Sequence, residues 1–243
     1  MKKILLDFWH FVKDPKDIQY TENDKKYKWK VFFTLFLFNI LFSVIYTGIY
    51  SLVNYFHPLE TVFDDLDLSP LLLVIIFPFI IPFLEEVFFR LGLRRKGIIA
   101  YIITDATWKK WFSIITYIST LSFALIHITN YKFDSYFFLL LAPILTLSQF
   151  VSGFIMTYLR VKFNFWMGFA FHAFWNLTVV IFMFNDLTTP KKDVEISNNT
   201  FQLKISKSSH FNFDNKTILY ATNLDTIYQL ETNKIVADEI IVD

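Results

Sequence analysis

The stretch that decides the fold is SPLLLVIIFPFIIPFLEEVFFR, residues 69–90. Its first fourteen residues are uncharged, and Glu85, Glu86 and Arg90 then follow close together. A helix of about 20 apolar residues crosses the hydrocarbon core of a bilayer, so this run predicts a transmembrane helix. A charge inside such a helix costs at least a few kcal/mol and usually faces the interior of the bundle. The three charged residues therefore mark a candidate site.

The composition also indicates a membrane protein. Hydrophobic residues make up 54% of the 243, 31 residues are Phe, and only 19% are charged, whereas soluble domains have about 25% charged residues. The net charge of +1 does not favour a nucleic-acid partner, which would need a basic surface. The absence of cysteine excludes disulfides, thiolate metal sites and a cysteine nucleophile.

Four further segments are apolar, uncharged apart from two histidines, and long enough to span. They are residues 31–53, 111–129, 136–159 and 165–184. Spanning segments must satisfy their backbone polar groups internally, which forces them to be helices. We therefore predict an all-α polytopic membrane protein, a bundle of about five to six transmembrane helices. Residues 31–184 would form this core.

The loops alternate between rich and poor in Lys and Arg. The first thirty residues carry eight Lys, residues 54–69 carry no Lys or Arg, and residues 94–110 are again basic. Cytoplasmic loops are the basic ones, so the sequence predicts a multi-pass protein of the cell membrane with segment 1–30 in the cytoplasm. Five spans then place the tail, residues 185–243, outside.

The two ends of the chain differ in character. Residues 1–12 are too short to span, but their apolar side chains predict a short interfacial helix. The tail is polar, and its stretch TFQLKIS, residues 200–206, alternates with the period of a strand. Short apolar stretches, TILYA at 217–221 and EIIVD at 239–243, follow it. We expect a small β-prone soluble C-terminal extension.

The spacing of the acids separates their roles. Glu86 and Arg90 lie four residues apart, so they share a helix face and can form an ion pair. Glu85 lies about 100° around the helix from Glu86 and points toward a neighbouring helix. Glu85 is therefore the freer carboxylate and the better general base.

Polar groups also occur in two other spans. His127 follows Phe123 by one turn, and His172 precedes Asn176 by one turn. His127 is seventeen residues from Lys110, whereas Glu85 is ten residues from Arg95. The two residues reach the same depth in the membrane only if the helix of His127 begins on the cytoplasmic side and includes Lys110. These groups alone also fit a structural ion pair, a helix–helix hydrogen bond or a proton pathway, and FPFIIP also fits a simple kink.

The order Glu-Glu-x-x-x-Arg at 85–90, Phe-x-x-x-His at 123–127 and His-x-x-x-Asn at 172–176 resembles the CPBP intramembrane protease family, also called the CAAX protease or Abi family. The resemblance covers about residues 70–180. It implies an intramembrane endopeptidase of the glutamate type, historically classed as a metalloendopeptidase. Its partners would be a peptide or protein substrate at the membrane and the lipid bilayer.

The resemblance implies a role for each matching residue. Glu85 would activate the attacking water, His127 would orient that water, and His172 and Asn176 would stabilise the oxyanion. Supporting residues would be Glu86, Arg90 and Phe123. No cofactor or metal is expected; where a zinc ion is bound, its ligands would be Glu85, His127 and His172.

Two features leave an alternative function open. Many family members have about eight helices, whereas this chain predicts five to six, and the soluble tail is unusual. The alternative is a non-catalytic membrane scaffold, or a bacteriocin-immunity-type protein, with the same fold.

Overall fold

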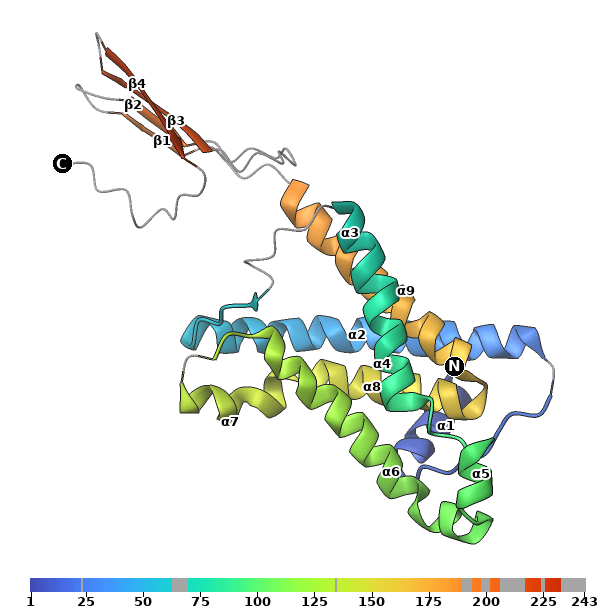
Figure 1. The fold of residues 1–243 in the computed structure, drawn as a ribbon. Coiled ribbons are helices and arrows are strands. Elements are labelled where there is room, and N and C mark those ends of the chain that lie inside the picture. The colour runs from blue at the N-terminus through green and yellow to red at the C-terminus, as the bar shows by residue number, and fades with distance from the viewer. Residues whose placement is uncertain are drawn as a thin grey trace. The chain divides into compact units, whose positions relative to one another are not determined.

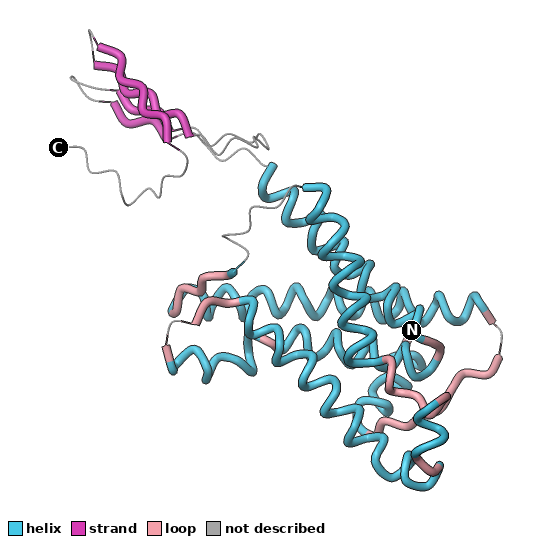
Figure 2. The backbone as a smooth tube through the Cα atoms, in the orientation of Figure 1, coloured by secondary structure: helices cyan, strands magenta, loops and turns pink. Residues whose placement is uncertain are grey.

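The structure is a computed structural model, and it describes residues 1–22, 24–62, 70–133 and 135–188 together with four strands of the tail (Figures 1 and 2). Its helical elements are α1 Lys2–Lys13, α2 Lys25–Phe56, α3 Pro70–Ile75, the π-helical η2 Ile76–Ile80, α4 Ile81–Arg90, α5 Ile98–Ile102, α6 Asp105–Ile126, the 3₁₀-helical η3 His127–Asn130, α7 Tyr136–Leu145, α8 Leu147–Lys162 and α9 Phe165–Thr188.

Five helical stretches are long and apolar enough to cross a membrane. They are Lys25–Phe56, Leu71–Arg90, Asp105–Asn130, Tyr136–Lys162 and Phe165–Phe182. Each contains one of the predicted spans or most of it, so the predicted polytopic all-α fold is confirmed. Chain contacts divide the molecule into two units, Met1–Thr178 and Val179–Asp243.

Helix α8 is the centre of the first unit. It packs against α1, α2, α6 and α7, and every residue from Ser152 to Val161 is buried. Small residues such as Ser152 and Gly153 allow close helix approach, which is how transmembrane helices pack. The predicted span 136–159 is interrupted, because α7 contains Pro143 and a break at Thr146 separates it from α8.

Aromatic rings attach α2 to α9. The Phe32 and Phe36 rings of α2 lie 5.4 Å and 5.7 Å from the ring of Phe171, and Phe36 also contacts Trp175 at 5.9 Å. These edge-to-face pairs are favourable beyond the area that they bury. They hold α9 in place, and α9 carries His172 and Asn176.

The predicted interfacial helix is a helix, but it packs on protein. Helix α1 buries Ile4, Phe8 and Phe11 in the core, where the Phe8 ring lies 5.6 Å from that of Tyr158 on α8. Asp7 accepts hydrogen bonds from Tyr158 and Lys162. Burial raises the pKa of Asp7, but these hydrogen bonds outweigh it and leave the pKa below its ordinary value. The apolar face of α1 thus covers α8.

The proline-rich stretch between α3 and α4 is a π-helical turn. The N–H of Ile81 donates to the carbonyl of Ile76, which is the i to i−5 bond of a π-helix. In the same register the carbonyl of Phe77 faces position 82, which is Pro and has no N–H. The Phe77 carbonyl accepts a hydrogen bond of 3.0 Å from Asn176 Nδ2 of α9. The FPFIIP stretch, which a simple kink would also fit, is therefore a π-turn that is hydrogen-bonded to α9.

Two arginines cap each other's helix. Arg160 of α8 donates to the carbonyls of Arg90 and Leu91 at the end of α4, at 3.0 Å and 2.9 Å. Arg94, just after α4, donates to the carbonyls of Val161 and Phe163 at the end of α8, at 2.6 Å and 3.2 Å. The last carbonyls of a helix lack intrahelical donors, so each guanidinium supplies hydrogen bonds to the terminal carbonyls of the other helix.

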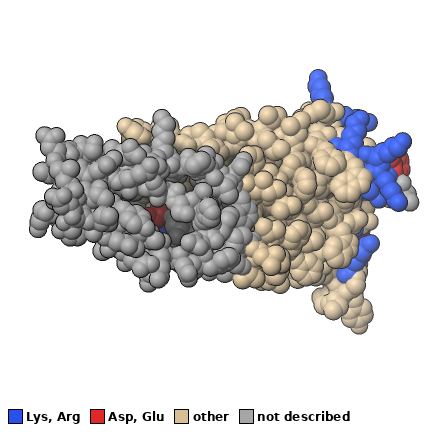
Figure 3. All heavy atoms as spheres, turned by 90° about the horizontal axis from the view of Figure 1, so that it is seen from above, with Lys and Arg blue, Asp and Glu red and all other residues tan. Residues whose placement is uncertain are grey.

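Basic residues gather at one end of the described helices (Figure 3). Several contacts join the basic segments there: Lys162 to Asp7, Trp108 Nε1 to Asp17 at 2.9 Å, and Arg95 N–H to Asp17 at 3.4 Å. Helix α6 begins at Asp105, so the predicted helical continuation through Lys109 and Lys110 is confirmed. The orientation of this end in the membrane stays a prediction.

The second unit contains a four-stranded antiparallel sheet. Its strands are β1 Val194–Ser197, β2 Gln202–Ile205, β3 Thr217–Asn223 and β4 Thr226–Thr232, in the order β1-β2-β3-β4. The alternating stretch TFQLKIS contributes β2 and TILYA lies in β3, whereas EIIVD lies outside the described residues. The predicted boundaries at 30/31 and 184/185 stay predictions.

The reciprocal caps make a testable contribution to stability. We expect Arg160→Met to lower the free energy of unfolding by about 1 kcal/mol, because the Leu91 carbonyl loses its Arg160 donor while the Arg90 carbonyl keeps the Leu93 N–H. Thermal unfolding of the detergent-solubilised protein measures this. Arg160→Lys keeps the charge but not the planar fork, so it should recover only part of the loss. Wild-type stability for Arg160→Met would show that the cap contributes nothing.

Candidate active site

The innermost part of the site is a buried ion pair on α4. Arg90 donates from a terminal nitrogen to Glu86 Oε1 at 2.6 Å, and both side chains are fully buried. The predicted pair is therefore present. Its other atoms are less well satisfied, since Glu86 Oε2 and the second terminal nitrogen of Arg90 have no hydrogen-bond partner among the described residues. Removing one member of such a pair leaves an uncompensated buried charge.

Glu85 points away from this pair toward two histidines, as its place on the helix predicts. Its Oε1 lies 3.9 Å from His127 Nε2, and its Oε2 lies 3.3 Å from His172 Nε2. The Glu85 side chain is 20% exposed, against 0% for Glu86. The site thus holds one accessible carboxylate and one enclosed carboxylate.

The end of α6 sets the tautomer of His127. Its Nδ1 lies 2.7 Å from the carbonyl oxygen of Phe123, one turn earlier. A carbonyl only accepts, so Nδ1 carries the proton and the neutral ring presents the lone pair of Nε2 to Glu85. Two acceptors therefore face each other across 3.9 Å.

His172 bridges the two acids. Its Nδ1 lies 3.1 Å from Glu86 Oε1, and its Nε2 faces Glu85. The Glu86 carboxylate already accepts from Arg90, so it can only accept from His172, and Nδ1 is the donor. This bond fixes the ring of α9 against α4 and aims Nε2 at the accessible carboxylate.

Phe123 packs against three residues of this site: His127, His172 and Arg90. Its ring lies 4.8 Å from the ring of His127 and 5.6 Å from that of His172. The guanidinium carbon of Arg90 lies 3.9 Å from the Phe123 ring centre, which is a cation–π contact in a buried setting. The predicted packing role of Phe123 thus extends to the ion pair.

Asn176, the fourth predicted catalytic residue, is hydrogen-bonded outside the cluster of Glu85, His127 and His172. It lies one turn after His172, and its amide nitrogen donates to the Phe77 carbonyl of the π-turn. No hydrogen bond joins Asn176 to Glu85, His127 or His172 among the described residues. The fold therefore brings together Glu85, His127 and His172, whereas Asn176 is bonded to the backbone of η2.

Sequence reasoning missed the contributions of α8, whose apolar run carries no intramembrane charge. Thr157 Oγ1 accepts a hydrogen bond of 3.4 Å from Arg90 Nε. Gly153 lies under Arg90 and Phe123, where a Cβ would come within 3.1 Å of the Phe123 ring. Gly168 at the start of α9 is equally close to Glu86, with 3.2 Å from an added Cβ to Oε2. In the sequence, a glycine among long apolar side chains in each of these two helices was the available sign of close helix packing.

The described residues contain no group of three or more His, Asp and Glu side chains that could hold a metal ion. Both Nδ1 atoms are directed to other partners, His127 to Phe123 and His172 to Glu86. The three residues named as zinc ligands, Glu85, His127 and His172, are neighbours, and the expectation that no metal is bound stays a prediction. We derive no catalytic step through a metal.

The comparison with protein families matches this same region. Residues 67–178 match the family model described as Rce1-like, type II CAAX prenyl endopeptidase Rce1-like. This segment is Rce1-like. The match confirms the predicted resemblance to the CPBP, or CAAX protease, family, and it includes all seven residues of the three motifs. The Rce1-like segment supports a membrane endopeptidase in general terms. Comparison with curated proteins and with solved structures found no match.

The two close-packed glycines of the Rce1-like segment can be tested against a third. An added methyl at Gly168 meets the Met156 carbonyl at 3.1 Å and Glu86 at 3.2 Å, whereas Gly48 of α2 has nothing within 4 Å of an added Cβ. We expect Gly168→Ala to destabilise the protein by about 1–3 kcal/mol through overpacking. Gly48→Ala should be neutral or slightly stabilising, since Ala favours helix.

Thermal unfolding in detergent checks both glycine variants. Equal stability of Gly168→Ala and Gly48→Ala would contradict the close approach of α9 to Glu86.

Proposed function

We propose that the protein is an intramembrane endopeptidase in which Glu85 activates the attacking water. The observation that carries the proposal is the Glu85 carboxylate between the Nε2 atoms of His127 and His172. A carboxylate beside a water-binding imidazole is a suitable general base for hydrolysis. The family match to residues 67–178 supports a peptide bond as the bond attacked.

His127 would hold the water rather than take its proton. Its Nε2 lone pair and Glu85 Oε1 are both acceptors, and 3.9 Å is too long for a direct hydrogen bond. A water beside the line between them can donate one hydrogen to each. Its own lone pair then points away from both, toward a substrate carbonyl. Glu85 would take the proton as the C–O bond forms and later give it to the leaving amine.

His172 would supply a donor to the oxyanion. As an imidazolium, with a proton on each ring nitrogen, His172 donates from Nδ1 to Glu86, so the ring stays oriented while its Nε2–H is directed at the reacting centre. The Glu86–Arg90 pair would keep this arrangement fixed without entering the chemistry. A preorganised donor in a site with little water is worth about 3 kcal/mol of transition-state stabilisation.

Asn176 would be the second oxyanion donor. A carboxamide has two N–H bonds, and the bond to Phe77 uses one of them. The bond holds the amide plane fixed, which leaves the second N–H with a set direction. The π-turn would thus orient Asn176 in the way that Glu86 orients His172.

The substrate would be a peptide or protein at or in the bilayer of the cell membrane. The basic end of the helices (Figure 3) supports a cytoplasmic N-terminus, with the tail outside. The substrate need not be prenylated, because the residues around Glu85 give no reason to require a prenyl group.

Replacing Glu85 tests the proposed base. We expect Glu85→Gln to reduce cleavage by about 10²–10⁴-fold, the usual contribution of general acid–base catalysis, without loss of folding because Glu85 is half-buried and outside the ion pair. Comparative proteomics of membranes with wild-type and Glu85→Gln protein identifies the substrate, and its cleavage rate is then measured. Glu60→Gln, at an exposed acid paired with Lys132, is the control.

A cleavage rate in Glu85→Gln equal to that of Glu60→Gln would refute the assignment of the base. If the uncleaving Glu85→Ala protein still fulfilled its role in cells, the non-catalytic scaffold or immunity function would replace the protease.

The metal dependence has a separate test. We expect purified, active protein to hold less than stoichiometric zinc by elemental analysis, and chelation to leave cleavage unchanged, because the described residues contain no group of three or more His, Asp and Glu side chains that could hold a metal ion. One zinc per chain that is lost in His172→Ala would overturn this expectation.

A further inference from the structure

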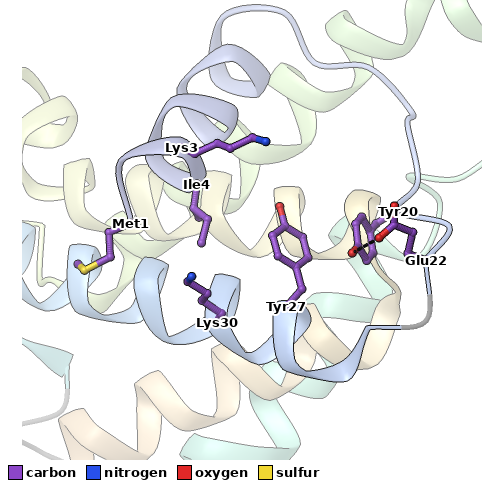
Figure 4. Close-up of a pocket in the computed structure, with 7 residues that line it drawn as sticks. All are labelled: Met1, Lys3, Ile4, Tyr20, Glu22, Tyr27 and Lys30. Carbon is purple, nitrogen blue, oxygen red and sulfur yellow. Dashed lines mark hydrogen bonds between the residues drawn. The ribbon is translucent and has the colours of Figure 1, made fainter.

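A pocket of about 340 Å³ lies away from the catalytic residues, between α1, the segment after it and the start of α2 (Figure 4). Lys3 and Ile4 of α1, Tyr20 and Glu22 of the connecting segment, and Tyr27 and Lys30 of α2 line it. None of these residues takes part in the chemistry proposed for Glu85. The pocket is at the basic end of the described helices.

The charges that line the pocket are mainly positive. Lys3 extends from α1 toward the hydroxyl of Tyr27, and Lys30 rises from α2 toward Ile4 (Figure 4). The one carboxylate, Glu22, accepts a hydrogen bond of 3.0 Å from the Tyr20 hydroxyl at the far side. Lysines from two helices thus line one pocket, which is suited to an anion with several oxygen acceptors.

An apolar stripe leaves the pocket along α2. Phe33, Leu37 and Leu41 follow Lys30 by three, seven and eleven residues, so all four lie on one helix face. These three side chains are 53%, 42% and 58% exposed. Since Lys25–Phe56 is a candidate membrane span, the stripe runs from the pocket into the hydrocarbon region. A ligand here can have both an anionic head and an apolar chain.

We propose that this pocket binds the phosphate headgroup of an anionic membrane lipid, with an acyl chain along Phe33, Leu37 and Leu41. Basic pockets between transmembrane helices on the cytoplasmic side recognise such headgroups. Free phosphate would use the two lysines but not the stripe, which is why the geometry favours the lipid.

The bound lipid would fasten α1 to α2. Helix α1 already contacts α8 through Asp7, Tyr158 and Lys162, and the lipid adds a bridge from Lys3 to Lys30. Because a ligand that binds the folded state alone stabilises it, an anionic lipid should raise the thermal stability of the protein.

The test uses full-length protein in a neutral detergent. Phosphatidylglycerol, phosphatidylcholine and inorganic phosphate are titrated separately, and thermal unfolding and native mass spectrometry record the stabilisation and the bound lipid. We expect phosphatidylglycerol alone to stabilise and to be retained. The double variant Lys3→Gln/Lys30→Gln should bind it about 30-fold more weakly, since each Lys near an anionic headgroup contributes about 1 kcal/mol.

The matched control is Lys25→Gln/Lys26→Gln, which removes the same charge from exposed positions of α2 outside the pocket. It should bind phosphatidylglycerol within a few-fold of the wild type. Equally weakened phosphatidylglycerol binding in both double variants would show an effect of surface charge alone and would overturn the proposal. Stabilisation by phosphatidylcholine or by inorganic phosphate equal to that by phosphatidylglycerol would also overturn it. The single variants Lys3→Gln and Lys30→Gln, each with one ammonium left, should lie between the wild type and the double variant.

Discussion

The buried ion pair of Glu86 and Arg90 is the interaction on which the rest of the site depends. Two fully buried charges are stable only when each is compensated and hydrogen-bonded. Arg90 reaches Thr157 of α8 and the ring of Phe123 on α6, while Glu86 reaches His172 of α9. The pair on α4 therefore has partners on the three neighbouring helices, so its correct formation requires all four to be in place.

The same contacts explain why the site can be rigid inside a lipid environment. Apolar side chains of neighbouring helices gain little from leaving lipid, so transmembrane packing depends on close approach and on polar contacts. Gly153 and Gly168 permit the close approach beside Arg90 and Glu86. Arg160 and Arg94 close the ends of α4 and α8. The position of Glu85 is thus set both by contacts within the site and by the arginine contacts at the ends of α4 and α8.

Much of this arrangement could be predicted from the sequence. Uncharged runs predicted the five spans, and the helical angle between Glu85 and Glu86 predicted which acid pairs with Arg90. Both inferences rest on local periodicity, which a single helix already determines. His127 and His172 could be assigned to the site as motif residues, but their approach to Glu85 depends on how three helices pack.

Contacts between distant segments could not be predicted in the same way. The run 136–159 has no charge, so nothing in its own pattern indicates that α8 is central or that Thr157 contacts Arg90. Helix α1 looks amphipathic whether it lies on lipid or on α8, because both surfaces are apolar. The bond from Asn176 to Phe77 requires the π-register, in which Pro82 faces the Phe77 carbonyl, and a proline pattern alone is equally typical of a plain kink.

The difference in exposure between the two acids follows from these contacts and separates their functions. Glu86 is enclosed because Arg90, His172 and Gly168 surround it. Glu85 lies beside the Nε2 atoms of two imidazoles and keeps 20% of its side chain exposed, which a general base needs if water is to reach it. One helical position, about 100° of rotation, thus turns a pair of identical residues into an anchor and a reactive group. A motif with its acids three or four residues apart would place both on one face and in competition for Arg90.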